Sequence, residues 1–452
     1  MEGLVSSMEK ELDYYWSLGE ILENAAGSCM IYKVQQHIRE ADRFSYEPFV
    51  VSIGPYHHGS SAVQAMEKEK LYYLDYILKL NREKTLLDYL TAIEAEGLAK
   101  QARHCYSETI KMNYDEFLQM LLLDGSLLLV SVGATKEIER QWWKVYNERS
   151  NVPTDETDRV VGTTDTASSQ EGDQSNNGGQ WFIRFFNHDI LLLENQIPFS
   201  IIKKIYNLVS GEESDGSQCA NDIAEYIESA LRCYPKAIRQ SDRPKSFHHL
   251  VHLCHMYFRP SQEVEDGHHH KIGRRSLIKF FSFGLKYFKL SHESDADERH
   301  TEPEHDLDRQ QAETQLNRRR RAAQYLEAGV KFKKREYSEL DPHSLLDIKF
   351  IHGIMEIPCL IIDELTAFLF RNLIAFEQTC PQFGDDFTAY IVFLSQLISM
   401  PEDVTLLTQR EIIVHHLESD EKVSDLFTLL SKDEGDSDYM LHTIETPFSN
   451  GH

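Results

Sequence analysis

The 452-residue chain is poor in positive charge, with 47 Lys and Arg residues against 73 Asp and Glu residues and a formal net charge of -26. Because binding to a phosphate backbone needs a positive face, this balance argues against a general nucleic-acid-binding role. The seven cysteines form no CxxC pair and their number is odd, which favours a reducing compartment. The chain also lacks an Asn-x-Ser/Thr acceptor and a signal-peptide pattern at its start, so nothing in it indicates secretion.

Long hydrophobic runs are scarce as well. The longest are "MLLLDGSLLLVSVG", which Asp124 interrupts, and "AYIVFLSQLISM", which is too short to cross a bilayer. We therefore expect no membrane span in the chain as given. The expected location is the cytoplasm or the cytoplasmic face of the plasma membrane.

Familiar catalytic motifs are also missing. The chain has no Walker A loop, no GxGxxG, no GxSxG, no HExxH and no kinase signature set. We accordingly predict no catalytic residue, no cofactor and no metal site. The alternative is an uncharacterised hydrolase or transferase with an unrecognised site, in which Glu194 or Glu377 would act as acid and base. We favour the view that these carboxylates cap helices and close a buried hydrogen-bond network, because buried charged groups are usually paired structurally.

Two groups of histidines are candidate metal ligands. His57 and His58 lie in "SIGPYHHG", where one proline and two glycines predict a turn after the apolar run "FVVSI". His248, His252 and His255 form a stripe along a predicted helix in "FHHLVHLCHMYF". The side chains of His57 and His58, being adjacent in sequence, point in different directions. The histidines of the stripe lie beside an apolar helix face, where such residues are usually hydrogen-bonded or solvated. Both groups are therefore predicted to be structural.

Changes in composition divide the chain. Residues 151–180 are polar, acidic and poor in large apolar side chains, which predicts a disordered linker, and a second insert is predicted at 260–315. The interrupted core is placed at 28–432. A helical extension is expected at 1–27 and a flexible tail at 433–452.

The predicted fold class is mainly α with a small antiparallel β sheet, in a single large irregular helical core with disordered inserts. The runs "GVKFKKREY", "LLDIKFI" and "IMEIPCL" are short and rich in strand-forming residues, and His352-Gly353 between the last two predicts a tight hairpin. "FVVSI" is predicted to be a buried strand of the same sheet. The run "DELTAFLFRNLIAFEQTC" predicts a helix with Asp363 at its N-cap.

A basic segment at 271–290, "KIGRRSLIKFFSFGLKYFKL", contains six basic residues and no acidic one. Leucines and phenylalanines, Phe281 and Phe288 among them, fall on one helical face, with Lys279 and Lys286 off that face. This pattern predicts contact with a partner or peripherally with a membrane through Lys279, Phe281, Lys286 and Phe288. The alternative is a core helix whose lysines face water.

Six blocks resemble the plant domain-of-unknown-function 247 family in order and approximate spacing. They are "MIYKVQQHIREADRFSYEPFVVSIGPYHHG", "MLLLDGSLLLV", "DILLLENQIPF", "YLEAGVKF", "LLDIKFIHGIMEIPCLIID" and "FRNLIAFEQ". The family usually has proline where this chain has Gln35. Family members typically also end in a membrane-spanning helix, and this chain stops at "TPFSNGH" without one.

The resemblance implies recognition rather than catalysis, because no enzymatic activity is established for the family as a class. Some grass members resemble male-side determinants of self-incompatibility, in which pollen declares its identity to the stigma. By this resemblance we expect a non-enzymatic recognition or signalling protein with an unknown protein partner and no nucleic acid. The two inserts are then the natural places for specificity, since surface loops tolerate variation.

Overall fold

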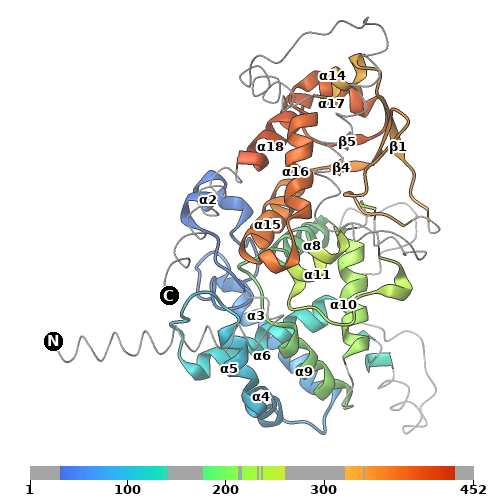
Figure 1. Cartoon of the computed structure of the whole chain (residues 1–452). Coiled ribbons are helices and arrows are strands. Elements are labelled where there is room, and N and C mark those ends of the chain that lie inside the picture. Colours follow the sequence, from blue (N-terminus) through green and yellow to red (C-terminus); the bar gives the residue numbers. More distant parts are fainter. Residues whose placement is uncertain are drawn as a thin grey trace, which may run out of the picture. The chain divides into compact units, whose positions relative to one another are not determined.

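A computed structural model (Figure 1) describes most of the chain between residues 31 and 432. The ranges described are 31–136, 138–140, 177–211, 216–231, 234–235, 238–259, 321–338 and 342–432. Contacts group these residues into two compact units. Unit 1 is Met1–Leu231 with Arg243–Cys254, and unit 2 is Arg232–Asp242 with His255–His452. The single core over 28–432 stays a prediction, and the predicted extension, the second insert and the tail lie outside the described residues.

Unit 1 is built from helices. They are α2 (Gln36–Ala41), α3 (Gln64–Leu80), α4 (Leu86–Glu94), α5 (Leu98–His104), α6 (Tyr114–Ser131), α8 (Asn177–Ile190), α9 (Phe199–Ser210), α10 (Ser217–Ala230) and the first residues of α11 (Leu250–Tyr257). Short 3-10 turns occupy Arg43–Ser45 and Ala95–Gly97. Because α8 begins at Asn177, the last four residues of the predicted 151–180 linker belong to this helix, and 151–176 lie outside the described residues.

Helix α6 forms the centre of unit 1 and packs against α3, α4 and α9 (Figure 1). Its apolar block "MLLLDGSLLLV" is buried almost throughout, and the Asn113 side chain caps its start by accepting the Glu116 N–H at 2.8 Å. A Cβ on Gly125 would lie 2.4 Å from Cδ1 of Ile205, so glycine permits the close approach of α9. The core of unit 1 is therefore a helix buried on all sides.

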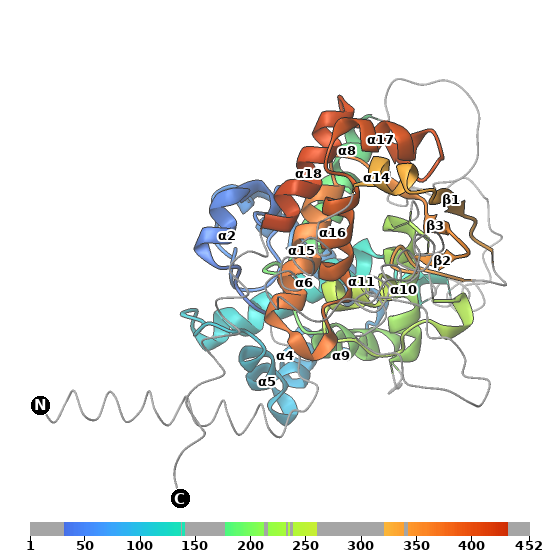
Figure 2. The same cartoon turned by 45° about the horizontal axis from the view of Figure 1, so that its top comes forward.

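Unit 2 combines helices with short strands. They are α14 (Ala322–Glu327), β1 (Lys331–Arg335), β2 (Lys349–Ile351), β3 (Ile354–Pro358), β4 (Leu360–Ile362), α15 (Thr366–Thr379), α16 (Asp386–Leu397), α17 (Pro401–Thr408), β5 (Ile413–His415) and α18 (Asp420–Lys432). Two 3-10 turns complete the unit, at Gln240–Asp242 and Pro381–Phe383. Helices α15, α16 and α18 pack together on one side of this unit (Figure 2). The mainly α class with a small β component is confirmed.

The strands form two small sheets. In the order β1-β3-β2, the β2–β3 pair is antiparallel with Ile351 opposite Ile354, and β1 runs parallel to β3. The turn His352-Gly353 has positive φ at both residues, 50° and 77°, as a tight hairpin turn requires. The predicted hairpin is confirmed. The parallel pairs β1–β3 and β4–β5 correct the expectation that the sheet is antiparallel throughout.

Helix α15 begins at Thr366 with Leu365 at its N-cap, two residues later than the predicted N-cap at Asp363. The Asp363 carboxylate accepts the N–H groups of Leu365 and Thr366 at 2.9 and 3.0 Å, and so satisfies donors at the helix start. The side chains of Phe370 and Phe387 contact edge-to-face with ring centroids 5.1 Å apart. Phe258 joins both rings, which makes an aromatic cluster the core of unit 2.

Candidate functional site

Residues 49–54, which lead into the turn "GPYHHG", are not part of a sheet; 51–54 are buried, whereas Phe49 is 40% exposed. The Asp189 carboxylate accepts the N–H groups of Phe49, Val50 and Val51 at 2.7–2.8 Å. The predicted strand pairing of this segment is therefore wrong. A side chain 138–140 residues away takes the hydrogen bonds that a neighbouring strand would otherwise make.

The Asn195 side chain binds the backbone of the same segment, at Val51 and Ile53. Its side-chain oxygen accepts the Ile53 N–H at 2.7 Å, and its amide group donates to the carbonyls of Val51 and Asp189 at 3.0 and 2.9 Å. The side chain of Gln196 likewise donates to two carbonyls of its own loop. The polar side chains of "DILLLENQIPF" thus bind backbone groups both of residues 49–53 and of their own block.

A buried ion pair holds the next part of the segment. Lys70 and Asp124 are 0% and 1% exposed, and Nζ of Lys70 lies 2.6 Å from Oδ1 of Asp124. Lys70 also donates to the Ser52 carbonyl at 2.7 Å, and Asp124 accepts the Gly54 N–H at 2.8 Å. Burial alone would lower the pKa of Lys70, but the carboxylates of Asp124 and Glu67 raise it, so the ammonium stays charged.

Glu194 joins the start of unit 1 to the same turn. One carboxylate oxygen accepts the Val34 N–H at 2.6 Å and a hydrogen bond from Arg39. The other oxygen lies 3.6 Å from Nε2 of His57. Burial, and then the nearby positive charge of Arg39, lower the pKa of His57 from 6.5 to about 4. His57 is therefore neutral at physiological pH.

The depressed His57 pKa makes a pH-dependent contribution to stability. Between pH 6.5 and 4 the unfolded chain protonates this imidazole and the folded chain does not, so the contribution is complete above pH 6.5 and is lost as pH falls to 4. Between pH 7 and pH 4.5, the unfolding free energy of the wild type should fall by about 2–3 kcal/mol more than that of the His57→Gln variant, which has no imidazole at this position. Urea denaturation at both pH values measures it. An equal fall in unfolding free energy for the wild type and the His57→Gln variant would contradict the lowered pKa of His57. The control is His58→Gln, which removes the other histidine of this turn and should leave the pH dependence of the wild type unchanged.

Glu377 has an equivalent role in unit 2. Its carboxylate accepts the N–H groups of Phe387 and Thr388 at 3.0 and 2.8 Å, at the first turn of α16. It also accepts the Thr388 hydroxyl and lies 2.8 Å from Nε2 of His255. Glu377 thus caps a helix, as predicted, whereas Glu194 takes part in a buried hydrogen-bond network without capping one. The two residues belong to different units.

The histidine stripe does not form a cluster of ligands. His252 accepts the backbone N–H of His248 at 3.2 Å, and their rings are stacked 5.0 Å apart, whereas His255 pairs with Glu377. His252 and His255 are buried, at 6% and 2% exposure. Within the described part of the chain, no three His, Cys, Asp or Glu side chains are arranged to hold a metal ion.

A cleft of about 360 Å³ opens in unit 1 beside the first turn of α9. The Phe199 N–H donates to the His248 carbonyl at 2.7 Å, and the Gln196 side chain accepts the Leu250 N–H at 3.0 Å. These bonds hold the start of α9 against the segment before α11. Arg243, paired with Glu228 at 2.9 and 3.0 Å, anchors the other end of that segment to α10.

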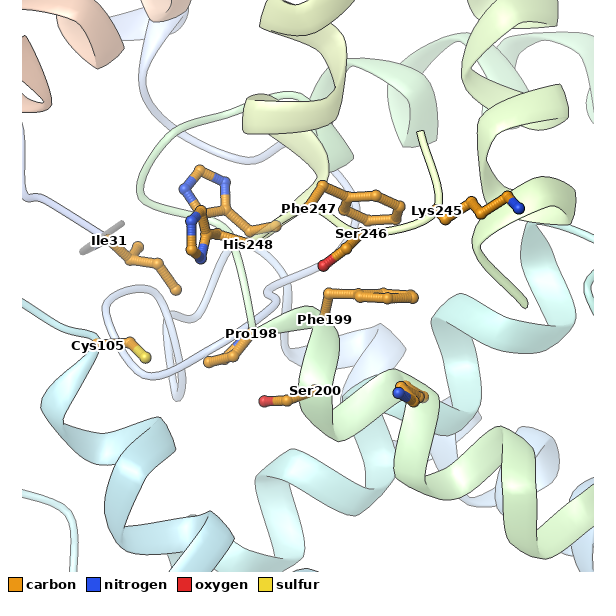
Figure 3. Close-up of a pocket in the computed structure, with 11 residues that line it drawn as sticks. Ile31, Cys105, Pro198, Phe199, Ser200, Lys245, Ser246, Phe247 and His248 are labelled. Carbon is orange, nitrogen blue, oxygen red and sulfur yellow. The ribbon is translucent and has the colours of Figure 1, made fainter. Parts of the chain in front are cut away.

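The wall of the cleft combines aromatic, hydroxyl and cationic groups. The rings of Phe199 and Phe247 lie one above the other, with centroids 4.2 Å apart (Figure 3). The full lining is Ile31, Cys105, Pro198, Phe199, Ser200, Lys203, Lys245, Ser246, Phe247, His248 and His249. It contains no carboxylate among these described residues, although the chain carries a net charge of -26. The charged side chains among these lining residues are those of Lys203 and Lys245.

The structure does not describe the predicted contact surface at 271–290, and it contains a cleft beside α9 that the sequence did not predict. Lys279, Phe281, Lys286 and Phe288 lie outside the described residues, so their contact with a partner or membrane stays a prediction. Lys203 and Lys245 were not singled out, because they are distant in sequence and neither belongs to a motif. The sequence feature that could have indicated the cleft is the block "ENQIPF". Its Gln196, just before α9, accepts the N–H of Leu250 at the start of α11 and so joins the two segments that line the cleft.

Among the residues that the structure describes, no single helix is long and apolar enough to cross a membrane. One pair of helices, Asp386–Leu397 and Pro401–Thr408, passes on length and composition when taken together, but the pair is bent by 104°.

Comparison with known proteins places the chain in a family. A family model described as "Plant protein of unknown function" (DUF247) matches residues 31–446. The "UPF0481 protein At3g47200" of Arabidopsis thaliana is 25% identical over 426 residues, covering 93% of this chain and 77% of the relative. The "Putative UPF0481 protein At3g02645" of the same plant is 20% identical, covering 89% and 78%. No solved structure gives a significant match. The chain thus belongs to the plant DUF247 family.

Proposed function

We propose that this is a non-enzymatic recognition protein of plants that binds a protein partner without chemical turnover, resembling the pollen-side determinants of self-incompatibility. The supporting observation is the use of its buried carboxylates. Glu194 and Glu377, which a catalytic interpretation would use as acid and base, both bind backbone N–H groups. Asp124 and Asp189 are used in the same way. Carboxylates that hold the backbone stabilise a scaffold, and a scaffold that presents a surface is what recognition requires.

One observation favours the alternative of a hydrolase or transferase. Cys105 lines the cleft together with His248 and His249, and a thiol near an imidazole is the composition of a nucleophilic site. The Cys105 thiol donates to the Gln101 carbonyl at 3.4 Å, within its own helical turn. A catalytic thiol would instead be directed to a base, so we rank this function second.

Capture of the partner tests the proposal. The full chain, immobilised, is exposed to separate extracts of pollen, stigma and leaf, and bound proteins are identified by mass spectrometry. Variants lacking 151–176 or 260–315 serve as matched controls, because the sequence places specificity in these inserts. We expect a protein enriched from one tissue by the full chain and lost with one of the deletions. Equal binding from all three tissues, unaffected by either deletion, would contradict the proposal.

A further inference from the structure

The described part of the chain begins in the wall of the cleft. Ile31 lines the cleft and is 1% exposed. Its N–H group donates to the Cys105 carbonyl, and its own carbonyl accepts the Ser107 N–H at 3.1 Å and the Tyr56 hydroxyl at 3.0 Å. These bonds hold Ile31 in place on both sides of its peptide unit. Residues 1–30, which lie outside the described residues, are therefore tethered at the cleft.

An apolar and aromatic surface extends from this attachment point. Figure 3 shows Ile31 and Cys105 at one end of the cleft and Lys245 at the other, with the rings of Phe199 and Phe247 between them. A volume of about 360 Å³ admits a few side chains of an extended segment but not a folded partner. The cleft is thus suited to a short stretch of peptide that carries apolar side chains.

The residues that precede Ile31 have a composition that matches this surface. Between Lys10 and Lys33 the sequence contains four acidic residues and no basic one. Within that stretch, residues 14–23, "YYWSLGEILE", combine aromatic and aliphatic side chains with two carboxylates. The charged side chains of the cleft lining are lysines, so the signs of charge are complementary.

The connection between this run and the cleft is short. Residues 24–30 separate the run from Ile31, and seven extended residues span up to about 23 Å, which is enough to cross the cleft. A segment on a short tether competes at an effective concentration on the order of millimolar, whereas a free partner has to bind from dilute solution. The attachment at Ile31 therefore favours the chain's own segment as the occupant.

We propose that residues 14–23 of the same chain occupy this cleft, with their apolar side chains against the rings of Phe199 and Phe247 and their carboxylates on the side of Lys203 and Lys245. The inference goes beyond the proposed function, because it concerns a contact within one chain. A consequence is that the segment covers the cleft in the free protein, and that any other molecule enters only after the segment has left.

The reactivity of Cys105 tests the proposal, because this half-buried thiol lines the cleft. The full chain is treated with N-ethylmaleimide, and the labelling of each cysteine is followed by peptide mass spectrometry. We expect Ile21→Ser combined with Leu22→Ser to raise the labelling rate of Cys105 at least about fivefold, because the apolar contacts of the segment are lost. Leu4→Ser combined with Val5→Ser is the matched control outside residues 14–23, and it should change the rate less than about twofold.

Two further measurements make the result specific. Cys254, which is 1% exposed, should stay unlabelled in every variant and so reports that the fold is retained. Glu20→Lys combined with Glu23→Lys is a second variant, which should also raise the Cys105 rate because it reverses the charge of the segment. A synthetic peptide of residues 11–25, added to the Ile21→Ser and Leu22→Ser variant, should slow the labelling again.

Three results would overturn the proposal. The first is an equal labelling rate of Cys105 in the wild type and in both variants while Cys254 stays unlabelled. The second is a protection of Cys105 that increases with protein concentration, which would assign the cleft to a second copy of the chain. The third is a protection that appears only when a plant extract is added, which would assign the cleft to an external partner.

Discussion

Gly54→Ala is expected to destabilise unit 1 by about 3 kcal/mol or more, whereas Gly59→Ala in the same turn should cost only about 1–2 kcal/mol. Both glycines have a φ of 77°, so an alanine pays a similar backbone penalty at either position. They differ in the space around them. A Cβ on Gly54 would lie 2.3 Å from the Gln196 carbonyl oxygen, and a Cβ on Gly59 would meet nothing within 4 Å.

The Gln196 carbonyl cannot move away at low cost, because it accepts the Tyr106 hydroxyl at 3.0 Å in a buried site. Unfolding free energies from urea denaturation of the two variants measure the difference. The matched pair isolates the steric contact from the backbone strain. Equal losses at the two positions would show that the close approach of the "SIGPYHHG" turn to the "ENQIPF" loop does not contribute to stability.

Lys70→Met should cost about 3–5 kcal/mol, because it leaves the Asp124 carboxylate buried without its partner. Adding Asp124→Asn to this variant should restore a substantial part of that loss. The amide oxygen can still accept the Gly54 N–H, and no uncompensated charge remains. A double-mutant cycle by urea denaturation gives the coupling energy between the two side chains.

Lys79→Met is the control for this cycle. Lys79 belongs to the same helix, α3, and pairs with Asp75 at the surface, where the two side chains are 67% and 55% exposed. Its loss should cost less than about 1 kcal/mol, as is usual for exposed ion pairs. A similar effect of Lys70→Met and Lys79→Met, or additive effects of Lys70→Met and Asp124→Asn, would show that the buried pair does not brace the turn.

Local patterns in the sequence predict the elements whose hydrogen bonds are local. Periodicity and turn chemistry within a few residues predict the hairpin at His352-Gly353 and helix α15, whose start is found two residues after the predicted one. The strand predicted at "FVVSI" fails for the opposite reason. Its apolar pattern indicates burial correctly, but its N–H groups bond to Asp189 and Asn195, which lie about 140 residues further along the chain.

The cleft could not be predicted for a related reason. Lys203 and Lys245 come from segments that are 42 positions apart and are joined through the Phe199–His248 backbone hydrogen bond and the Gln196 side chain. Neither lysine belongs to a periodic pattern or a recognised motif. The sequence did indicate that "ENQ" closes a buried polar network, and the structure adds that the same network positions one wall of the cleft.

We propose that the polar residues of "ENQIPF" and "FRNLIAFEQ" stabilise the fold and that the protein recognises a partner without chemical turnover. The most direct measurement is the intact mass of the partner captured from plant tissue, recorded before and after incubation with the wild-type protein and with the Glu194→Gln, Glu377→Gln and Cys105→Ala variants. The account predicts an unchanged partner mass in every case, with binding retained by each variant that remains folded. A partner that is cleaved or modified by the wild type, and left intact by a folded variant of any of these three residues, would contradict it.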